Sequence, residues 1–212
     1  MHITTKISND VLTNFVYEIE DISYLSSFTD KNYPAVILNR TIFSNIQNWL
    51  NSIDPILMPC FRKIIHKSEV KNTINTVFKN SSLKDGSKIL WLTKDMIKLS
   101  EAFSNLMKVN FIRLRLEVVS TNSCRKFHID AVKGRLICTY RGQGTQYGIS
   151  TDGGDPQYFQ TTPTGSPILL RGSLWSEDIS LRILHRSPPI EGTGETRFVF
   201  IIDPIFDPEN EI

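Results

Sequence analysis

The chain has 212 residues, of which 40% are hydrophobic and 22% are charged, as in an ordinary globular domain. Its net charge of +2 gives no reason to expect nucleic acid or an acidic membrane as a partner. It contains no apolar run of about 18 residues, the length that a membrane-spanning helix needs. Three widely spaced cysteines and a first segment without a signal-peptide pattern argue against a secreted disulfide framework. We therefore expect a cytoplasmic protein.

The first half of the chain, residues 1–109, reads mainly as helix and connecting loop. Residues 41–50 place their apolar side chains on one helical stripe, and residues 58–79 fit one or two further amphipathic helices. The apolar run at 88–92 predicts a short strand, and Thr93 is the expected N-cap of another helix.

After residue 110 the hydrophobic period changes from helical spacing to strict alternation. Residues 111–118 alternate apolar and charged side chains, which predicts a half-buried strand. Turn residues then separate further short strands, which we expect at 124–130, 135–141, 157–161, 167–171, 181–186 and 196–202. This series predicts an antiparallel sandwich or barrel over residues 110–204, packed against the helical first half and followed by a short tail at 205–212.

His128 and Asp130 are the first candidate metal ligands. On an extended backbone, residues two apart point to the same face, so the imidazole and the carboxylate can converge on one ion. His185 is a second imidazole, carried by a later predicted strand. Two histidines and one carboxylate form the facial triad of non-haem Fe(II) oxygenases, which leaves coordination positions open for a cosubstrate and oxygen. The alternatives are a strand histidine bonded to Asp130 and a packing role for His185.

Arg197 is the most informative single residue, because it interrupts the apolar strand predicted at 196–202. A buried guanidinium is costly without a partner, so this side chain is expected to face an anion. One interpretation is the distal carboxylate of a diacid cosubstrate, held by two parallel hydrogen bonds. The other is an internal ion pair with Asp203, Glu117 or Glu195.

Cys124 offers a different metal chemistry. It lies four residues before His128, and its thiolate could complete a closed tetrahedral zinc site with the three candidate ligands. Cys60 and Cys138 lie in apolar runs and are expected in the core.

Other polar residues near these motifs have less specific interpretations. Tyr140 and Arg141 are candidates for the mouth of the pocket, and Tyr140 is the second candidate cofactor-binding residue after Arg197. Arg113 and Arg115, on the alternating strand, are typical of a solvated sheet face.

Three motifs carry a resemblance to a known family. They are Cys-Arg-Lys-Phe-His-Ile-Asp at 124–130, Arg-Leu-Ile-Cys-Thr-Tyr-Arg-Gly-Gln-Gly-Thr at 135–145 and His-Arg-Ser-Pro-Pro at 185–189. Together they resemble a bacterial family of domains of unknown function, numbered 1826, over residues 90–204. At a deeper level, the order of His-x-Asp, a distal His and an Arg on the following strand is similar to that of the 2-oxoglutarate- and Fe(II)-dependent dioxygenases.

The deeper resemblance implies an α+β protein with a C-terminal double-stranded β-helix, a cupin-like jelly-roll, and a set of roles. His128, Asp130 and His185 would be the iron ligands, and Arg197 would bind 2-oxoglutarate. Arg197 is followed by Phe198 and Val199 rather than by the Arg-x-Ser of many members, so a second cosubstrate contact is not carried over.

The hypothesis from the sequence is therefore an oxidoreductase that uses Fe(II) and 2-oxoglutarate to hydroxylate a substrate, either a small molecule or a protein. The alternative is a non-catalytic protein of metal binding or metal homeostasis that holds zinc in the same pocket with the help of Cys124.

Overall fold

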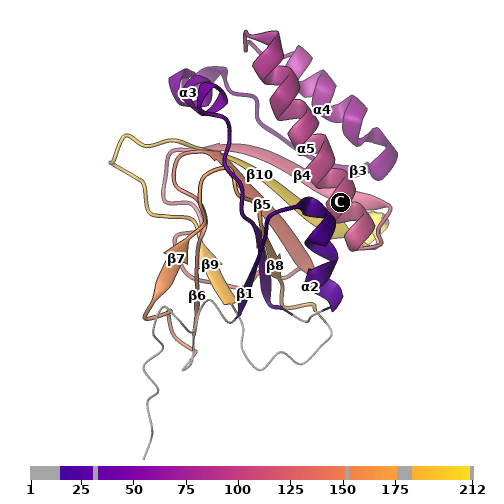
Figure 1. Ribbon diagram of the computed structural model, residues 1–212, viewed down its shortest axis with the longest axis vertical. Helices are drawn as coiled ribbons and strands as arrows, with labels where there is room; N and C mark the ends of the chain where they lie inside the picture. Colours follow the sequence, from indigo (N-terminus) through magenta and orange to yellow (C-terminus); the bar gives the residue numbers. More distant parts are fainter. Residues whose placement is uncertain (1–14, 31–32, 151–152, 176–182, 211–212) are drawn as a thin grey trace, which may run out of the picture.

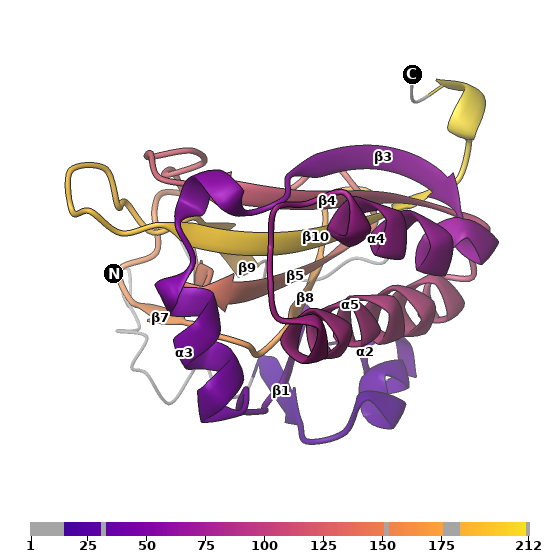
Figure 2. The same ribbon diagram turned by 90° about the horizontal axis from the view of Figure 1, so that it is seen from above.

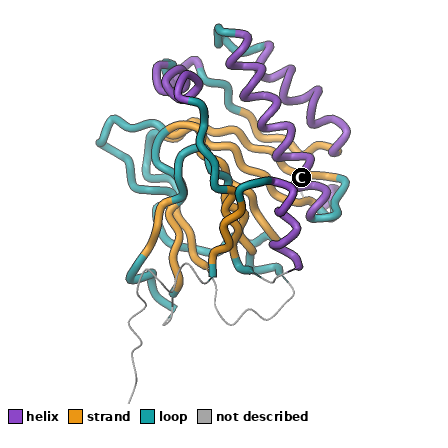
Figure 3. Tube along the Cα trace, in the orientation of Figure 1, coloured by secondary structure: helices purple, strands orange, loops and turns teal. Residues whose placement is uncertain are grey.

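The structure is a computed structural model that describes residues 15–30, 33–150, 153–175 and 183–210. Two β-sheets and a layer of helices make up the fold (Figures 1 and 3). The large sheet has the strand order β1-β2-β8-β5-β10-β4-β3 and the small sheet the order β7-β6-β9. Their bounds are β1 Val16–Ile19, β2 Ala35–Leu38, β3 Phe61–His66, β4 Phe111–Val119, β5 Gly134–Arg141, β6 Gln146–Ile149, β7 Phe159–Thr161, β8 Ile168–Arg171, β9 Ile183–Arg186 and β10 Arg197–Ile205.

The helices cover one face of the large sheet (Figure 2). The α-helices are α2 Ser27–Asp30, α3 Ser44–Ser52, α4 Val70–Lys79 and α5 Gly86–Leu106, and the short 3-10 helices are η1 Ile22–Ser26, η2 Pro55–Leu57, η3 Lys67–Glu69 and η4 Pro208–Asn210. None of the helices among the described residues combines the length and the apolar character that a membrane crossing requires.

Strand alternation divides the buried side chains into two cores. On β4, Ile112, Leu114 and Leu116 are fully buried against the helices. On β5, Leu136 and Tyr140 face the same helical core. The opposite face of the large sheet forms a second core with the small sheet, built from residues of β1, β2, β5, β6, β8, β9 and β10. The large sheet therefore packs against the helices with one face and against the small sheet with the other.

The expectation of a mixed helix-and-sheet fold is confirmed, but the sheets are not confined to the C-terminal half. β1, β2 and β3 come from the first 109 residues and pair with strands of the large sheet. The predicted strand at 111–118 corresponds to β4, and those at 135–141, 157–161, 167–171 and 196–202 correspond to β5, β7, β8 and β10. The predicted strand at 181–186 corresponds to β9, apart from residues 181 and 182, which lie outside the described residues.

Four local predictions were wrong. Residues 88–92 belong to α5, which begins after Asp85, whose side chain accepts a hydrogen bond from the backbone of Lys88. Thr93 is therefore inside this helix and is not its N-cap, since a short apolar run fits a buried helix as well as a strand. Residues 61–66 form β3 rather than helix, and β4 supplies its backbone partners. Residues 124–130 form a loop in which a single β-bridge replaces the expected strand.

Candidate metal centre

The loop between β4 and β5 carries the first two candidate ligands, and a backbone bridge aligns it with the third. The amide of His128 donates to the carbonyl of His185 on β9, and the amide of His185 donates back, both at 3.0 Å. This antiparallel pairing brings the two imidazole rings to a centroid separation of 4.6 Å. The return of the loop toward β5 requires Gly172, because a Cβ there would lie 1.9 Å from the carbonyl oxygen of Val132.

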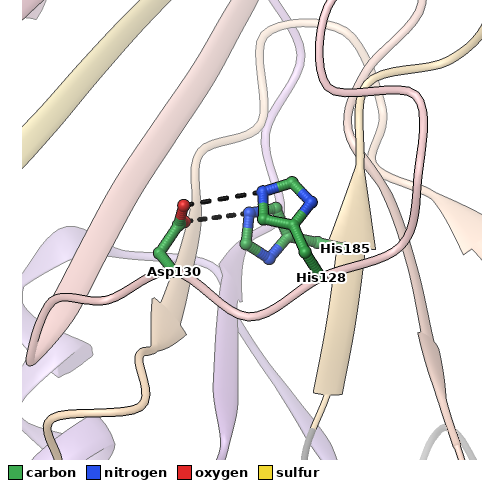
Figure 4. A group of neighbouring side chains, drawn as sticks. All are labelled: His128, Asp130 and His185. Carbon is green, nitrogen blue, oxygen red and sulfur yellow. Dashed lines mark ion pairs between the residues drawn. The ribbon is translucent and has the colours of Figure 1, made fainter.

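His128, Asp130 and His185 converge on one point (Figure 4). One potential ligand atom from each residue lies within 4.8 Å of the others. The Nε2 atom of His185 is 2.9 Å from Oδ2 of Asp130, and Nε2 of His128 is 3.6 Å from Oδ1. The sequence-based expectation that these three side chains meet is therefore correct, although a loop and not a strand presents the first two.

Hydrogen bonds around the ligands leave the metal-binding atoms available. Nδ1 of His128 lies 2.8 Å from the carbonyl oxygen of Lys126, which can only accept, so the ring proton sits on Nδ1 and the lone pair on Nε2. Arg135 donates to Oδ1 of Asp130. The other carboxylate oxygen, Oδ2, is buried and lies 2.9 Å from Nε2 of His185, but the contact does not have hydrogen-bond geometry and no other described residue donates to it. A buried carboxylate oxygen without a donor fits a cation as its partner.

The charges of the three groups also suit a metal. Burial alone would raise the pKa of Asp130, but His128, His185 and Arg135 outweigh it and hold that pKa well below its usual range. Burial lowers the pKa of His185, which favours the neutral imidazole that binds metals. The carboxylate of Asp130 raises the pKa of His128. Two imidazoles and one carboxylate, all on one side, form the donor set typical of non-haem Fe(II).

Arg197 lies in the same pocket and has no acidic partner among the described residues. It is only 2% exposed. Its Nε donates to the carbonyl of Gln143 at 2.7 Å, Nη1 to Ser187 Oγ at 2.8 Å and Nη2 to Thr139 Oγ1 at 3.2 Å. All three acceptors are neutral, and burial lowers the pKa of Arg197 to about 10.

The carboxylates that were candidates for pairing with Arg197 have other partners. Asp203 pairs with Arg115 and Arg135. Glu117 lies 3.7 Å from Arg115, and Glu195 accepts hydrogen bonds from the amide and the side chain of Gln143. The internal ion pair expected as the alternative for Arg197 is therefore not formed.

Tyr140 lies elsewhere, which corrects its assignment to the pocket. Its phenol is fully buried on the helical face of β5 and donates to Oδ2 of Asp95 at 2.6 Å. Successive residues of a strand face opposite sides, so Tyr140 cannot share the pocket with Thr139. Arg141 donates to the carbonyl of Ile53 at the end of α3.

None of the three cysteines, all of which are described, belongs to the candidate metal cluster. Cys124 lines the pocket, but its sulfur does not belong to the group of ligand atoms formed by the three candidate residues. Cys138 is buried as expected, whereas Cys60 is exposed, contrary to the expectation of a core position.

Arg135, Arg115 and Asp203 also belong to this region. Arg115 was expected on a solvated sheet face, but its side chain is only 15% exposed, and Asp203 was expected as a partner of Arg197. Asp203 is fully buried and accepts from both arginines. A signal for Arg135 existed, since it opens an apolar strand as Arg197 does, but its partner could not be inferred without the pairing of β5 with β10.

Comparisons with known proteins agree with this architecture. A dioxygenase for auxin oxidation from rice has a TM-score of 0.51 and 8% sequence identity, with 92% of this chain and 83% of that chain covered. The dioxygenase for auxin oxidation 1 from Arabidopsis thaliana, as a 2-oxoglutarate complex, has a TM-score of 0.49 and 7% identity, with 92% and 93% covered.

At these identities the likeness concerns the fold alone, and this chain shares its overall fold with the rice enzyme. The chain has no significant sequence match among curated proteins. One family model matches residues 20–203. The chain therefore belongs to the family described as Protein of unknown function (DUF1826).

Proposed function

We propose that the protein is a non-haem Fe(II)- and 2-oxoglutarate-dependent dioxygenase that hydroxylates its substrate. One observation carries the proposal: His128 and His185, two members of the candidate metal cluster, line the same pocket as the buried Arg197, which has no acidic partner in the part of the chain that the structure describes. A fold like that of a rice enzyme named as a dioxygenase agrees with it.

Each residue has a distinct task in this proposal. His128 and His185 would bind Fe(II) through imidazole nitrogens, and Asp130 through Oδ2, the oxygen that has no hydrogen bond. Arg135 keeps Oδ1 occupied and so orients the carboxylate. Arg197 would bind the far carboxylate of 2-oxoglutarate, because a guanidinium matches a carboxylate with two parallel hydrogen bonds.

The bound metal and cosubstrate would supply the oxidising power for C–H hydroxylation, coupled to decarboxylation of 2-oxoglutarate. The chain itself supplies geometry and exclusion of water. Val199 and Ile201 line the pocket together with Ile137, so apolar side chains flank the polar groups. Ser187 and Thr139 hold the guanidinium of Arg197 through their hydroxyls, which limits its rotation before the cosubstrate arrives.

The direct test is a spectrum recorded without oxygen. Fe(II) and 2-oxoglutarate added together should give a visible charge-transfer band, which Fe(II) or 2-oxoglutarate alone does not give. The variant Asp130→Ala should lack the band, and Arg197→Met should require a higher concentration of 2-oxoglutarate to produce it. A wild-type protein that binds Fe(II) but gives no band would contradict the proposal.

The zinc alternative has less support. It needs a fourth protein ligand, and the sulfur of Cys124 is outside the cluster of ligand atoms. The three free thiols, including this one, agree with a reducing compartment such as the cytoplasm, which we keep as the proposed location.

A further inference from the structure

A groove extends the metal pocket toward the edge of the large sheet. Among the described residues, the core between the two sheets contains none from β3 or β4, so this end of the face turned away from the helices is not packed into it. Figure 2 shows β3 as the edge strand beside β4. A groove of about 500 Å³ lies at this edge, a volume in the range of small-molecule sites. It shares Glu117, Val119 and Ser123 with the metal pocket, so the two spaces adjoin.

Two arginines lie directly opposite each other at the junction. Arg62 on β3 pairs in register with Arg115 on β4, and strand alternation places both on the face turned away from the helices. Like charges in opposite positions of neighbouring strands are unfavourable. Arg62 is exposed, lines the groove, and has no side-chain hydrogen bond or ion pair among the described residues. The pair thus concentrates positive charge where the groove meets the pocket.

Arg115 uses few of its hydrogen-bond donors, although its side chain is only 15% exposed. Its contacts are one hydrogen bond of 3.3 Å to Asp203 and a 3.7 Å approach to Glu117. Arg135 competes for the same Asp203 and holds it more closely, at 2.6 Å. The Nε atom of Arg115 is buried without any hydrogen bond. Burial lowers the pKa of Arg115, and the charges of Arg135 and Arg62 add to this effect, whereas Asp203 and Glu117 oppose it.

We propose that Arg62 and Arg115 together bind an oxyanion, and that the substrate of this site is therefore a small molecule carrying a carboxylate or a phosphate. A guanidinium fork binds either group with paired, charge-assisted hydrogen bonds. The hydroxyls of Ser120, Thr121 and Ser123 line the groove and offer further donors. Held there, the anionic end of the substrate would leave its other end to reach the metal pocket. That the bound anion is a substrate rests on the proposed function, whereas the binding of the anion does not.

A substitution of Glu117 is expected to change anion affinity in the opposite direction to substitutions of the two arginines. Its carboxylate is the internal competitor for Arg115, and it lines both the pocket and the groove. Removing its charge should strengthen binding of an anion, whereas removing either arginine should weaken it.

The test measures the dissociation constants of phenyl phosphate, phenylacetate and neutral benzyl alcohol by calorimetric titration. Metal-free protein and protein loaded with Fe(II) and 2-oxoglutarate under argon are both titrated. At least one of the two anions should bind more tightly than the alcohol. The anion that binds more tightly indicates whether the substrate carries a phosphate or a carboxylate. Arg62→Gln and Arg115→Gln should each weaken that binding about tenfold or more, and Glu117→Gln should tighten it. Lys63→Gln is the matched control, because Lys63 is exposed on the same strand but faces the other side; its affinity should stay that of wild type.

Four results would overturn the proposal. They are equal binding of the anions and the alcohol, unchanged affinity in Arg62→Gln, an equal loss in Lys63→Gln, and a loss in Arg197→Met alone, which would place the anion in the cosubstrate position. Arg62 is exposed, so its variant remains informative even if Arg115→Gln fails to fold. If the anion binds both preparations but 2-oxoglutarate does not bind the Fe(II)-loaded protein, the proposed function is contradicted and this inference stands.

Discussion

Arg135 donates two hydrogen bonds to the buried carboxylate of Asp203, from Nε to Oδ1 at 2.6 Å and from Nη2 to Oδ2 at 3.1 Å. Its remaining nitrogen, Nη1, donates to Oδ1 of Asp130. One guanidinium thus connects a strand of the sheet core to a candidate metal ligand in the loop. The orientation of Asp130 depends on a residue that does not itself bind the metal.

We expect Arg135→Met to weaken metal binding by about 10- to 100-fold, because partners that orient a ligand commonly contribute that much. The same change leaves Asp203 without its closest partner, so the free energy of unfolding should fall by about 3–5 kcal/mol. Urea unfolding and metal titration measure the two effects. Arg125→Met is the control at an exposed arginine. An unchanged metal affinity in a folded Arg135→Met protein would remove its positioning role.

The three candidate ligands should behave alike. His128→Ala, Asp130→Ala and His185→Ala should each abolish or greatly weaken binding of one divalent ion while the protein stays folded. His66→Ala is the matched histidine control, because His66 lies outside the cluster and caps a short helix through its Nδ1. Metal analysis after dialysis, with circular dichroism for folding, checks the expectation. Equal metal content in the three variants and wild type would refute this ligand set.

Cys124→Ser should retain the metal, because an open iron site does not use the thiolate. A closed zinc site would lose its fourth ligand and release the ion. The measurement is the Fe(II) content of the variant under argon, with wild type prepared in parallel. Release of metal from Cys124→Ser would favour the zinc alternative.

Arg197→Met should change the stability of the metal-free protein by less than about 1 kcal/mol. The loss of three hydrogen bonds is offset by removal of a buried charge that no described carboxylate pairs with. The variant should keep its metal but lose the rise in melting temperature that 2-oxoglutarate gives the metal-loaded wild type. Arg197→Lys keeps the charge without the fork and should recover part of the rise. A variant that responds to 2-oxoglutarate as wild type does would contradict the cosubstrate role.

The metal-free protein should lose stability on mild acidification, in part because of His185. Its pKa is lowered by burial, so the unfolded chain binds more protons than the folded protein as pH falls through the ordinary histidine value of about 6.5. This contribution is therefore present at neutral pH and decreases below it. His128, whose pKa is raised by Asp130, contributes in the opposite direction. Urea unfolding at pH 7.5 and 5.5 should show a smaller loss for His185→Gln than for wild type; an equal loss would exclude His185 as a source.

Sequence patterns predicted the parts of the fold in which one strand face is buried. The alternation at 111–118 identified β4, because Ile112, Leu114 and Leu116 are fully buried on the core side of that strand. The run at 88–92 failed, since four consecutive apolar residues carry no period, and the cap that decides the matter is Asp85, upstream of the run. The spacing of apolar residues thus predicted an element correctly where buried positions recur at a regular period. It did not predict one whose start is set by a single capping hydrogen bond.

The candidate site shows the same division. The closeness of His128 and Asp130 followed from their spacing, and the exceptional position of Arg197 followed from its apolar surroundings. The face of β5 on which the Tyr140 side chain lies could not be predicted from the sequence, because it depends on which face of the strand packs against the helices. Arg62 and Arg115 lie far apart in the sequence, and only the register of β3 on β4 makes them neighbours.

The bridge between His128 and His185 has a consequence for how the protein is handled. An ion shared by the two histidines would add to the connection between the β4–β5 loop and β9. After a chelator removes the ion, three backbone hydrogen bonds remain there, two between His128 and His185 and one from Ser187 to Cys124. Lys126 and Arg125 precede His128 in that loop and are exposed, so trypsin can cut there when the loop opens. Protease resistance at this point would then report metal occupancy in crude extracts, without purification or a known substrate.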